Sequence, residues 1–370
     1  MGTVWREIRS DFPALARWVY LNAAAGSPTP RPVREAVDGF YRQLEEDGDG
    51  PWDEWLERRE QVRSRVARFV GAEPGEVAFV TNTSAGVNLI VDLLAGDGPV
   101  LSVEREFPTV TLPWIHRGVS VRLVAPEARA LPASIFARDR APESATIVVS
   151  HVQFATGCRL DLDAIGALKQ ERNLVVCGSQ SAGAFPIDVR RSGIDAFTTS
   201  GHKWMCAGYG AGFAVVRRDV LERCPPAEIG WLSVADPFTF ENRRYRVLPT
   251  AARHEMGCPP FAGIFALGAA VDYLSGIGME AIADRVLTLN RYLTDRLERA
   301  GIDVLSPGGA FRSGATLCAV RDGARTAAAL KERRVSVTEK PEGLRIATHF
   351  YNDESDVDAC VDALVALRRA

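Results

Sequence analysis

Lysine is scarce in this sequence. Lysine and arginine together number 44 among the 370 residues, and only four of them are lysines. The chain is also rich in alanine, glycine and valine, a combination typical of coding by a GC-rich genome. The shortage still limits the chemistry, because a reaction that requires a lysine amine has only four candidates: Lys169, Lys203, Lys331 and Lys340.

The sequence also has no strong charge imbalance and no long hydrophobic run. The net charge is −3 and the isoelectric point is near 6.1, so no basic field favours nucleic acid or an anionic membrane. No run reaches the ~18 apolar residues of a membrane-spanning helix. Residues 1–20 lack the basic segment and apolar core of a signal peptide. We therefore expect a cytoplasmic protein that binds neither nucleic acid nor membrane.

The cysteines form no recognisable metal or disulfide motif. They are seven, an odd number, and none belongs to a CxxC pair or a Cys/His cluster. We expect no metal site and reduced thiols, as in a cytoplasm. The cysteines are Cys158, Cys177, Cys206, Cys224, Cys258, Cys318 and Cys360.

Between Glu76 and Arg217, short β-branched runs alternate with helical stretches. The runs are almost continuously apolar, which is typical of strands covered on both faces. This alternation predicts an α/β fold with a mostly parallel, seven-stranded sheet and helices on both faces. The strand candidates are Val77–Val80, Val100–Val103, Val119–Val124, Thr146–Ser150, Leu174–Val176, Asp195–Thr199 and Gly212–Val216.

Helices are expected before this region, and a smaller α+β domain is expected after it. The predicted division is an N-terminal segment of residues 1–30, a large domain of 31–250 and a small C-terminal domain of 251–370. The helix candidates outside the sheet region are 33–46, 52–69, 262–274, 278–300, 324–332 and 355–368, and the late strand candidates are 316–320, 335–338 and 344–348.

The most informative segment is Ser200-Gly201-His202-Lys203-Trp204, which directly follows a predicted strand. A lysine at a strand end, followed by the glycine-rich residues 206–212, is poorly explained as a solvated surface charge. The position lets a hydroxyl, an imidazole and an amine converge on one ligand. The other three lysines have ordinary solvated interpretations, since Lys169 and Lys331 fall in predicted helices and Lys340 in a turn.

Eight ordered motifs resemble the class V aminotransferase and cysteine desulfurase family, whose members are pyridoxal-phosphate enzymes of fold type I. The resemblance spans nearly the whole chain, and it implies that fold with pyridoxal 5'-phosphate as cofactor. The motifs are Leu21–Gly26, Thr81–Asn88, Glu106–Pro108 with Pro113-Trp114, Ser150–Gln153 with Thr156-Gly157, Gly178–Gly183, Ser200–Lys203, Gly257–Pro259, and Leu344–Ile346 with His349–Asn352.

The resemblance implies a cofactor site centred on Lys203, which would form a Schiff base with the cofactor aldehyde and act as general base. Three polar residues precede an apolar helix, so their hydroxyls and backbone N–H groups can hold a phosphate at its N-terminus. These three are Asn82, Thr83 and Ser84. The other implied cofactor contacts are Ser200 and His202 to the phosphate, Phe107 on the ring, Gln180 and Gln153 to the phenolic oxygen, and Cys177 and Cys258.

Arg345 is the candidate for the substrate α-carboxylate, because a guanidinium fork matches a carboxylate with two parallel hydrogen bonds. The resemblance adds Asn22 and His349 to the substrate side, although His349 equally fits a structural role. It also implies a homodimer with shared active sites, in which Gly257-Cys258 contributes across the interface. Specificity is expected in residues 231–253 and 335–343.

Cys177 departs from the family pattern. Twenty-six residues before the Schiff-base lysine, relatives have an aspartate that keeps the pyridine nitrogen protonated, so that the ring acts as an electron sink. A thiol, whose reference pKa is near ~8.5, is a weaker partner unless it is ionised. Two interpretations stay open: a retuned cofactor, or a degenerate, non-catalytic relative. We favour retuning, because Lys203, Gln180 and Arg345 are kept.

A cysteine is absent where desulfurases carry their nucleophile, on the loop before the arginine strand. Residues Val335–Gly343 contain none, which predicts that the chain is not a persulfide-forming cysteine desulfurase. The layout is similar to the isopenicillin-N-epimerase-like branch, which serves secondary metabolism in many cases.

These observations predict a pyridoxal-phosphate enzyme, a lyase or transferase, that acts at the α- or β-carbon of an amino acid or amino-acid conjugate. β-Elimination of the C–S lyase type or decarboxylation is ranked first, because Cys177 disfavours a fully delocalised carbanion. Transamination and epimerisation follow. The rival from another class is a non-catalytic protein that binds the cofactor or a ligand without turnover.

Overall fold

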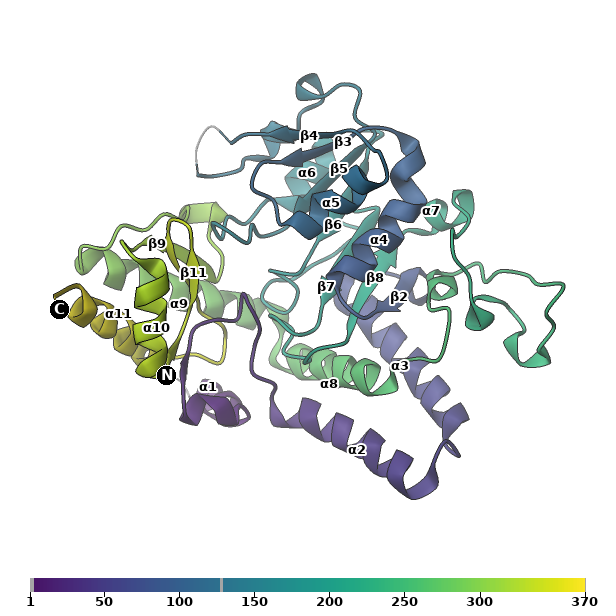
Figure 1. Ribbon diagram of the computed structural model, residues 1–370, viewed down its shortest axis with the longest axis horizontal. Helices are drawn as coiled ribbons and strands as arrows, with labels where there is room; N and C mark the ends of the chain where they lie inside the picture. Colours follow the sequence, from purple (N-terminus) through teal and green to yellow (C-terminus); the bar gives the residue numbers. More distant parts are fainter. Residues whose placement is uncertain (1–2, 127–128, 370) are drawn as a thin grey trace.

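The computed structural model describes residues 3–126 and 129–369, and it contains the expected central sheet (Figure 1). The seven strands lie in the order β2-β8-β7-β6-β5-β3-β4. The five adjacent strands β7, β6, β5, β3 and β4 run parallel to one another, whereas β8 is antiparallel to both of its neighbours. The predicted fold class is confirmed. The strands are β2 (Val77–Val80), β3 (Val100–Val103), β4 (Val121–Val124), β5 (Thr146–Ser150), β6 (Asn173–Cys177), β7 (Ala196–Ser200) and β8 (Gly212–Val216).

Helices cover both faces of this sheet, which explains why its strands are apolar almost without interruption. On one face, α4 and α5 pack over strand residues such as Val148 and Val175. On the other face, the alternate residues Ile147 and Val176 join a core with α3, α6 and α8. The helices around the sheet are α3 (Trp52–Val70), α4 (Thr83–Leu94), α5 (Pro108–His116), α6 (Leu162–Leu168), α7 (Arg218–Arg223) and α8 (Phe261–Ile277).

Helix α8 packs on α2 (Arg31–Asp47) and α3 through a cluster of aromatic side chains. Phe40 lies 5.0 Å from Trp55 and 5.7 Å from Phe265, measured between ring centroids. A bend of 79° separates α8 from α9 (Met279–Arg299). Among the described residues, no single helix is long and apolar enough to cross a membrane, although this bent pair reaches that length together.

A smaller part of the molecule carries a second sheet, which stands beside the first (Figure 1). Its strands are antiparallel in the order β11-β12-β9, and α9, α10 and α11 pack on them through an apolar core that includes Leu293, Leu330 and Leu364. We call this sheet with its helices the small part, and the seven-stranded sheet with its helices the large part. The elements added here are β9 (Ala315–Ala319), α10 (Gly323–Glu332), β11 (Thr338–Lys340), β12 (Gly343–Ala347) and α11 (Glu354–Arg369).

The strand predicted over 335–338 is divided in the structure. Its first half, β10 (Val335–Ser336), pairs in parallel with β1 (Val19–Tyr20), and its second half begins β11, which pairs with β12. The division follows burial, because Val335 is buried in the core of the small part whereas Thr338 is half-buried at the face of β11. The local sequence pattern does not show that these four consecutive residues pair with two different strands.

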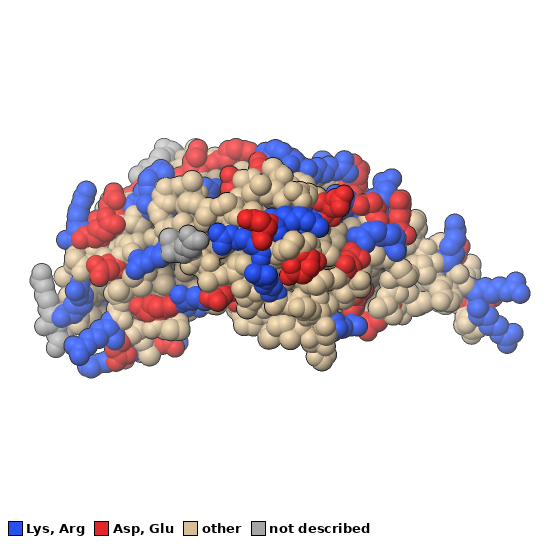
Figure 2. All heavy atoms as spheres, turned by 90° about the horizontal axis from the view of Figure 1, so that it is seen from above, with Lys and Arg blue, Asp and Glu red and all other residues tan. Residues whose placement is uncertain are grey.

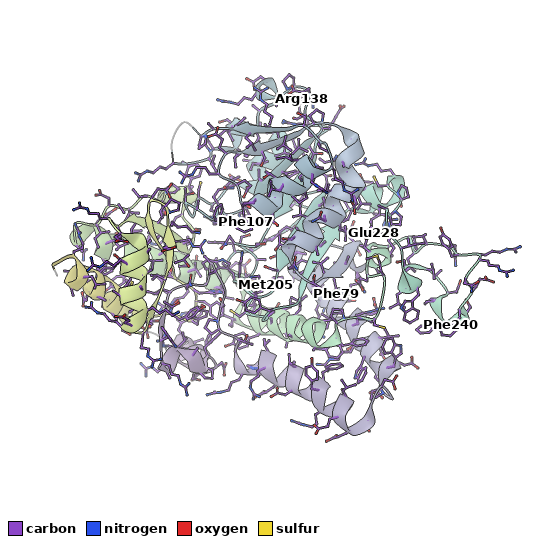
Figure 3. All side chains as sticks on the ribbon, viewed as in Figure 1. Phe79, Phe107, Arg138, Met205, Glu228 and Phe240 are labelled. Atoms are coloured by element: carbon purple, nitrogen blue, oxygen red, sulfur yellow. The ribbon has the colours of Figure 1, made fainter. Side chains whose placement is uncertain are left out.

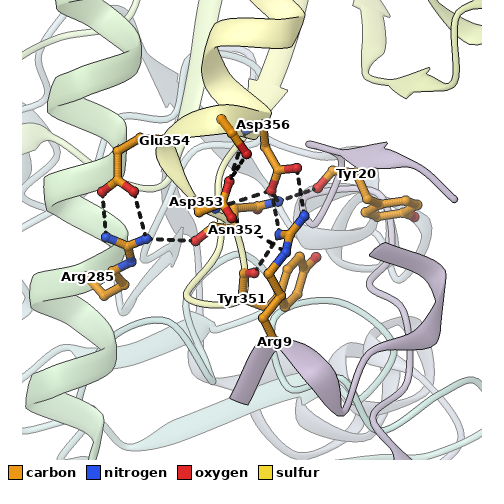
Figure 4. A network of polar contacts seen from close by, with 9 residues as sticks. Arg9, Tyr20, Arg285, Tyr351, Asn352, Asp353, Glu354 and Asp356 are labelled. Carbon is orange, nitrogen blue, oxygen red and sulfur yellow. Dashed lines mark hydrogen bonds and ion pairs between the residues drawn. The ribbon is translucent and has the colours of Figure 1, made fainter. Parts of the chain in front are cut away.

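The N-terminal segment is fastened to the small part by a network of charges and amides (Figure 4). Arg9, on α1 (Thr3–Ser10), donates to both carboxylate oxygens of Asp356 at 2.7 and 3.0 Å. Asn352 donates to the Tyr20 carbonyl at 3.0 Å and to Asp356 at 2.9 Å. The network therefore ties α1 and β1 to the start of α11 and to the segment that connects β12 with α11.

Residues 225–258 form an excursion from the large part, and Phe240 lies near its tip (Figure 3). It contains only short 3-10 turns, at Trp231–Ser233, Pro237–Thr239 and Ala251–His254. Figure 2 shows acidic and basic side chains intermingled over one face of the molecule, with basic side chains at the end of a projection.

Candidate active site

A cavity of about 440 Å³ opens where the carboxyl ends of β5, β6 and β7 face the small part. Parallel strands place their carboxyl ends at one edge of the sheet, which is where α/β folds bind ligands. Phe107 lies on this side, between the two parts (Figure 3). The lining residues are Ala24, Ala25, Asn82, Thr83, Ser84, Phe107, Thr109, Ser150, Phe154, Cys177, Ser179, Gln180, Ser200, His202, Lys203, Thr338, Lys340 and Arg345.

Lys203 lies in the turn that follows β7, as predicted, and its side chain lines the cavity. Its Nζ is 5.7 Å from the centre of the Phe107 ring. Burial lowers the pKa of the Lys203 ammonium, and the Arg345 guanidinium lowers it further, while Cys177 acts in the opposite direction. A lowered pKa makes the neutral, nucleophilic amine more accessible than in an ordinary lysine.

The N-terminus of α4 forms one end of the cavity. The Asn82 side chain accepts a hydrogen bond from the Ala85 N–H at 3.0 Å, a cap typically worth about 1 kcal/mol. The next N–H groups, those of Thr83 and Ser84, lie in the first turn, where a helix offers no acceptor. Gly86 lets α4 approach β7, because a Cβ there would lie 2.0 Å from Thr198 Oγ1. The helix therefore presents donors beside the strand that ends in Ser200.

Ser200 and His202 complete a group that we call the anion cradle: Asn82, Thr83, Ser84, Ser200 and His202. Ser200 Oγ is buried without a hydrogen-bond partner among the described residues. His202 stacks on Tyr209 at 4.6 Å, and burial followed by the Lys203 charge lowers its pKa to about 4. An unsatisfied hydroxyl, free helix N–H groups and a neutral imidazole fit the phosphate of pyridoxal phosphate.

Cys177 ends β6 and is the register partner of Ser150 on β5. Its Sγ donates to Ser179 Oγ at 3.4 Å. Burial raises the pKa of the Cys177 thiol, and the nearby Glu106 carboxylate contributes to the rise. A raised pKa favours the neutral thiol, which carries no charge to replace that of an aspartate.

Glu106 is a buried residue whose importance the sequence motif did not reveal. Its carboxylate accepts four hydrogen bonds: from the N–H groups of Phe107 and Ser150 at 2.8 Å, from Ser150 Oγ at 2.7 Å and from Gln153 Nε2 at 2.9 Å. Ser150 lines the cavity, so the carboxylate acts on the cavity through a hydroxyl. Only the folding of β3 beside β5 brings Glu106 to this place.

Gln180 lines the cavity with both ends of its amide engaged. Its Nε2 donates to the Ala24 carbonyl at 2.8 Å, and its Oε1 accepts from Trp204 Nε1 at 2.8 Å. An amide nitrogen carries two hydrogens, so one donor is left for a ligand. The neighbours fix which end of the amide faces the cavity.

Arg345, on β12, is 4% exposed and closes the cavity from the small part. One Nη donates to the Phe154 carbonyl at 2.9 Å, while Nε is buried without a partner among the described residues. Burial lowers the pKa of the guanidinium to about 10. Guanidinium donors remain available for a carboxylate.

Lys340 lines the same cavity, contrary to the expectation of a solvated lysine in a turn. It ends β11, and a two-residue turn, Pro341-Glu342, leads into β12. Its Nζ lies 5.0 Å from the centre of the Phe154 ring. Alternation along β11 places Thr338 and Lys340 on one face, and the pairing of β11 with β12, which carries Arg345, brings that face to the cavity. We call Thr338, Lys340 and Arg345 the cation wall.

Four predicted site residues lie outside the lining of the cavity among the described residues. Gln153 is buried and donates a hydrogen bond to Glu106. Asn22 accepts a hydrogen bond from the hydroxyl of Thr338, which lines the cavity. His349 is fully buried, with Nε2 2.8 Å from the Trp204 carbonyl and Nδ1 accepting from the Phe350 N–H, which matches its structural alternative. Cys258 is exposed.

Solved structures share this architecture. A cysteine desulfurase from Thermococcus onnurineus NA1, in its apo form, has a TM-score of 0.90 at 23% identity, with 98% of both chains covered. The cystine C–S lyase C-DES, in complex with its reaction product cysteine persulfide, has a TM-score of 0.86 at 22% identity, covering 96% of this chain and 99% of that one. The fold is that of pyridoxal-phosphate enzymes of fold type I, as predicted.

The aminotransferase class-V family matches residues 19–360. The chain belongs to this family, whose cofactor is pyridoxal phosphate and whose enzymes act on amino acids. The family and cofactor predictions are confirmed. Relatives include the uncharacterized aminotransferase YcbU of Bacillus subtilis (28% identity over 97% of each chain), a cysteine desulfurase of Cronobacter sakazakii (30%, 98% of each) and an isopenicillin N epimerase of Amycolatopsis lactamdurans (28%, 100% of each).

The exclusion of cysteine desulfurases was wrong. Enzymes of that name stand among the relatives at 30% identity and among the structures with the same fold. The exclusion depended on the absence of cysteine from residues 335–343. A nucleophile on a loop is positioned by the tertiary structure, so one nine-residue window of a chain at this identity does not decide the reaction.

Proposed function

We propose that this chain cleaves a bond at the α- or β-carbon of an amino acid or amino-acid conjugate, with β-elimination at a C–S bond as the favoured reaction. The observation that carries the proposal is the placement of Lys203 and Arg345 on opposite sides of one cavity, beside Phe107 and Cys177. Decarboxylation, which also breaks a bond to the α-carbon, is the second candidate. The relatives keep transamination, epimerisation and desulfuration among the reactions to be measured.

When bound, pyridoxal phosphate supplies an electron sink for the electron pair that is left at the substrate α-carbon. Lys203 would hold the cofactor covalently, and the anion cradle would hold its phosphate. The lowered pKa of Lys203 suits the amine to remove and return a proton at the α-carbon. Phe107 offers an apolar face and no proton, so Lys203 is the group for proton transfer on that side.

Arg345 would orient the substrate through its α-carboxylate. Its bond to the Phe154 carbonyl fixes one side of the guanidinium, and the Nε–H without a partner awaits an acceptor. A buried guanidinium without a carboxylate partner is costly, which favours an anionic ligand at this position.

Cys177 and Glu106 bear on which reaction is favoured. A neutral thiol at Cys177 does not keep a ring nitrogen protonated as a carboxylate does, whereas the Glu106 carboxylate lies behind Ser150 and accepts a hydrogen bond from its hydroxyl. The electron sink would therefore be weaker than in relatives with aspartate. A weaker sink favours rapid departure of a β-substituent over a long-lived carbanion that is reprotonated.

The proposal is tested by absorbance and product analysis on purified chain. Wild type with pyridoxal phosphate is expected to show a visible band that Lys203→Ala lacks, while Lys331→Ala, which alters an exposed lysine on α10, keeps it. Amino acids and cysteine S-conjugates, L-cysteine included, are then titrated and their products identified. Failure of every compound to change the spectrum of a cofactor-loaded wild type would refute the enzyme proposal.

We also propose that the chain works as a homodimer. Phe107 and Tyr209 are 43% and 78% exposed beside the cavity, and Leu112 and Ile115 of α5 are exposed as well. Exposed apolar side chains grouped near a site are typical of a protein interface. The same preparation is expected to show the mass of two chains in light scattering; a single-chain mass would contradict the interface.

A further inference from the structure

We infer that Lys340 is a specificity-determining residue that binds a second anionic group, so that the substrate is an amino acid with a carboxylate or similar anion on its side chain. The inference rests on the proposed function, because it assigns the α-carboxylate to Arg345 and the cofactor to Lys203. It adds a substrate class to the proposed reaction.

The geometry places Lys340 in the cavity together with the groups that surround the reacting atoms. Phe107 and Phe154 contact each other edge to face, with ring centres 5.1 Å apart. Lys203 Nζ lies over the first ring at 5.7 Å, and Lys340 Nζ lies over the second at 5.0 Å. The two ammonium groups therefore flank one aromatic pair, and Arg345 bonds the backbone of its second member.

The sheet register fixes this arrangement. Arg345 on β12 is the partner of Thr338 on β11, and Lys340 pairs with Gly343 where the hairpin closes. Gly343 has a φ of +148°, and a Cβ there would lie 2.1 Å from the Cys318 carbonyl oxygen, so the hairpin cannot shift easily. Thr338 and Lys340 share a strand face, two residues apart.

Lys340 has no carboxylate partner in the part of the chain that the structure describes. No acidic residue stands among the described residues that line the cavity, whereas Lys203, Lys340 and Arg345 are basic. Neither Lys340 nor Arg345 forms an ion pair with a described carboxylate, and nearby Glu342 is paired with Arg105. Burial, then Arg345 and Lys203, lower the pKa of Lys340 to about 8, so the ammonium is mostly charged at pH 7.

These charges outnumber the anions of an ordinary substrate. The anion cradle would bind the cofactor phosphate, Lys203 would bond the cofactor itself, and Arg345 would bind the α-carboxylate of the substrate. Lys340 is then a half-buried cation with only an aromatic contact, and a cation taken from water calls for an anionic partner. A substrate with one more negative charge supplies it.

The test compares acid and amide pairs of equal size on the cofactor-loaded protein. L-Glutamate is titrated against L-glutamine, and L-aspartate against L-asparagine, by the change in cofactor absorbance. We expect wild type to bind at least one acid about tenfold or more tighter than its amide, the effect of one charge-assisted hydrogen bond. Lys340→Met is expected to remove the preference, Lys340→Arg to retain most of it, and the surface control Lys331→Met to leave it unchanged.

A second readout does not need an amino group or turnover. Calorimetric binding of glutarate, a dicarboxylate, and butyrate, a monocarboxylate, is measured on the same loaded proteins. Glutarate is expected to bind about tenfold or more tighter than butyrate to wild type, and Lys340→Met is expected to abolish that difference. An equal preference in wild type and Lys340→Met, or no preference in wild type, would overturn the inference.

The two measurements separate this inference from the proposed function. If amino acids change the spectrum but Lys340→Met keeps the wild-type preference, Lys340 has no role in specificity and the proposed function stands. If no amino acid changes the spectrum but glutarate binding depends on Lys340, the enzyme proposal fails and the second anion position stands.

Discussion

The anion cradle and the cation wall are two sides of one cavity, and they differ in how they attract negative charge. The cradle uses neutral groups, namely helix N–H donors, hydroxyls and an imidazole whose pKa is lowered to about 4 by burial and Lys203. The wall uses the full charges of Lys340 and Arg345. Fixed neutral dipoles suit a cofactor that remains bound. Unpaired buried charges are stabilised most when an anionic substrate arrives from solvent.

This difference indicates a division of labour between the two parts of the chain. The large part would keep the cofactor, and the small part would select the substrate. Substitutions on the two sides should therefore change different measured quantities, and three experiments can break or sharpen the comparison.

The largest effect is expected from Arg345→Gln in the cation wall. Losing two charge-assisted hydrogen bonds, each worth about 1.5–3 kcal/mol, should lower kcat/KM for any accepted amino acid by about a hundredfold or more. Arg345→Lys should recover only part of this loss, since an ammonium lacks the fork. Cofactor affinity, measured by equilibrium dialysis, should stay within about twofold. A comparable loss of cofactor affinity would show that the two sides do not act separately.

A smaller effect with the opposite signature is expected from Ser200→Ala in the anion cradle. Removing a hydroxyl that we expect to bond the charged phosphate should weaken pyridoxal-phosphate affinity by about tenfold. The relative response to different amino acids, measured at saturating cofactor, should not change. Selectivity that shifts with Ser200→Ala would contradict a division between the two sides.

The smallest effect is expected from Cys177→Asp, at the end of β6, where Cys177 lines the cavity between the anion cradle and the cation wall. A carboxylate there would strengthen the electron sink, and products of transamination or epimerisation should increase a few-fold relative to elimination products. Product ratios measured by chromatography on one substrate test this, with Cys177→Ser as the neutral control. Unchanged rates and ratios in the aspartate variant would remove any special role for Cys177.

The sequence predicted the parts of the site that depend on local order. Lys203 follows a recognisable strand, and Asn82–Ser84 precede a recognisable helix, so their positions at the sheet edge follow from the parallel topology. Six of the seven strands were predicted to within one residue, because they are buried almost throughout and their runs are strongly apolar. The edge strand β4, in which Arg122 and Leu123 are exposed, was predicted to begin two residues too early.

Other features depend on contacts between distant segments, and these were missed. Lys340 reaches the cavity because β11 pairs with β12, and Glu106 acts on it because β3 lies beside β5. In each case the missing information was long-range pairing, which neighbouring residues do not encode.

The pairing of β1 with β10, together with the Arg9–Asp356 contact, has a consequence for how the protein is made. These contacts join residues 9–20 to residues 335–356, and Asn22 bridges to Ala347, the last residue of the strand β12 that carries Arg345. During synthesis, the N-terminal segment emerges first but must wait for its partners until almost the whole chain has left the ribosome. The cation wall, whose residues lie between positions 338 and 345, is therefore completed late in synthesis, after all seven strands of the central sheet have been made.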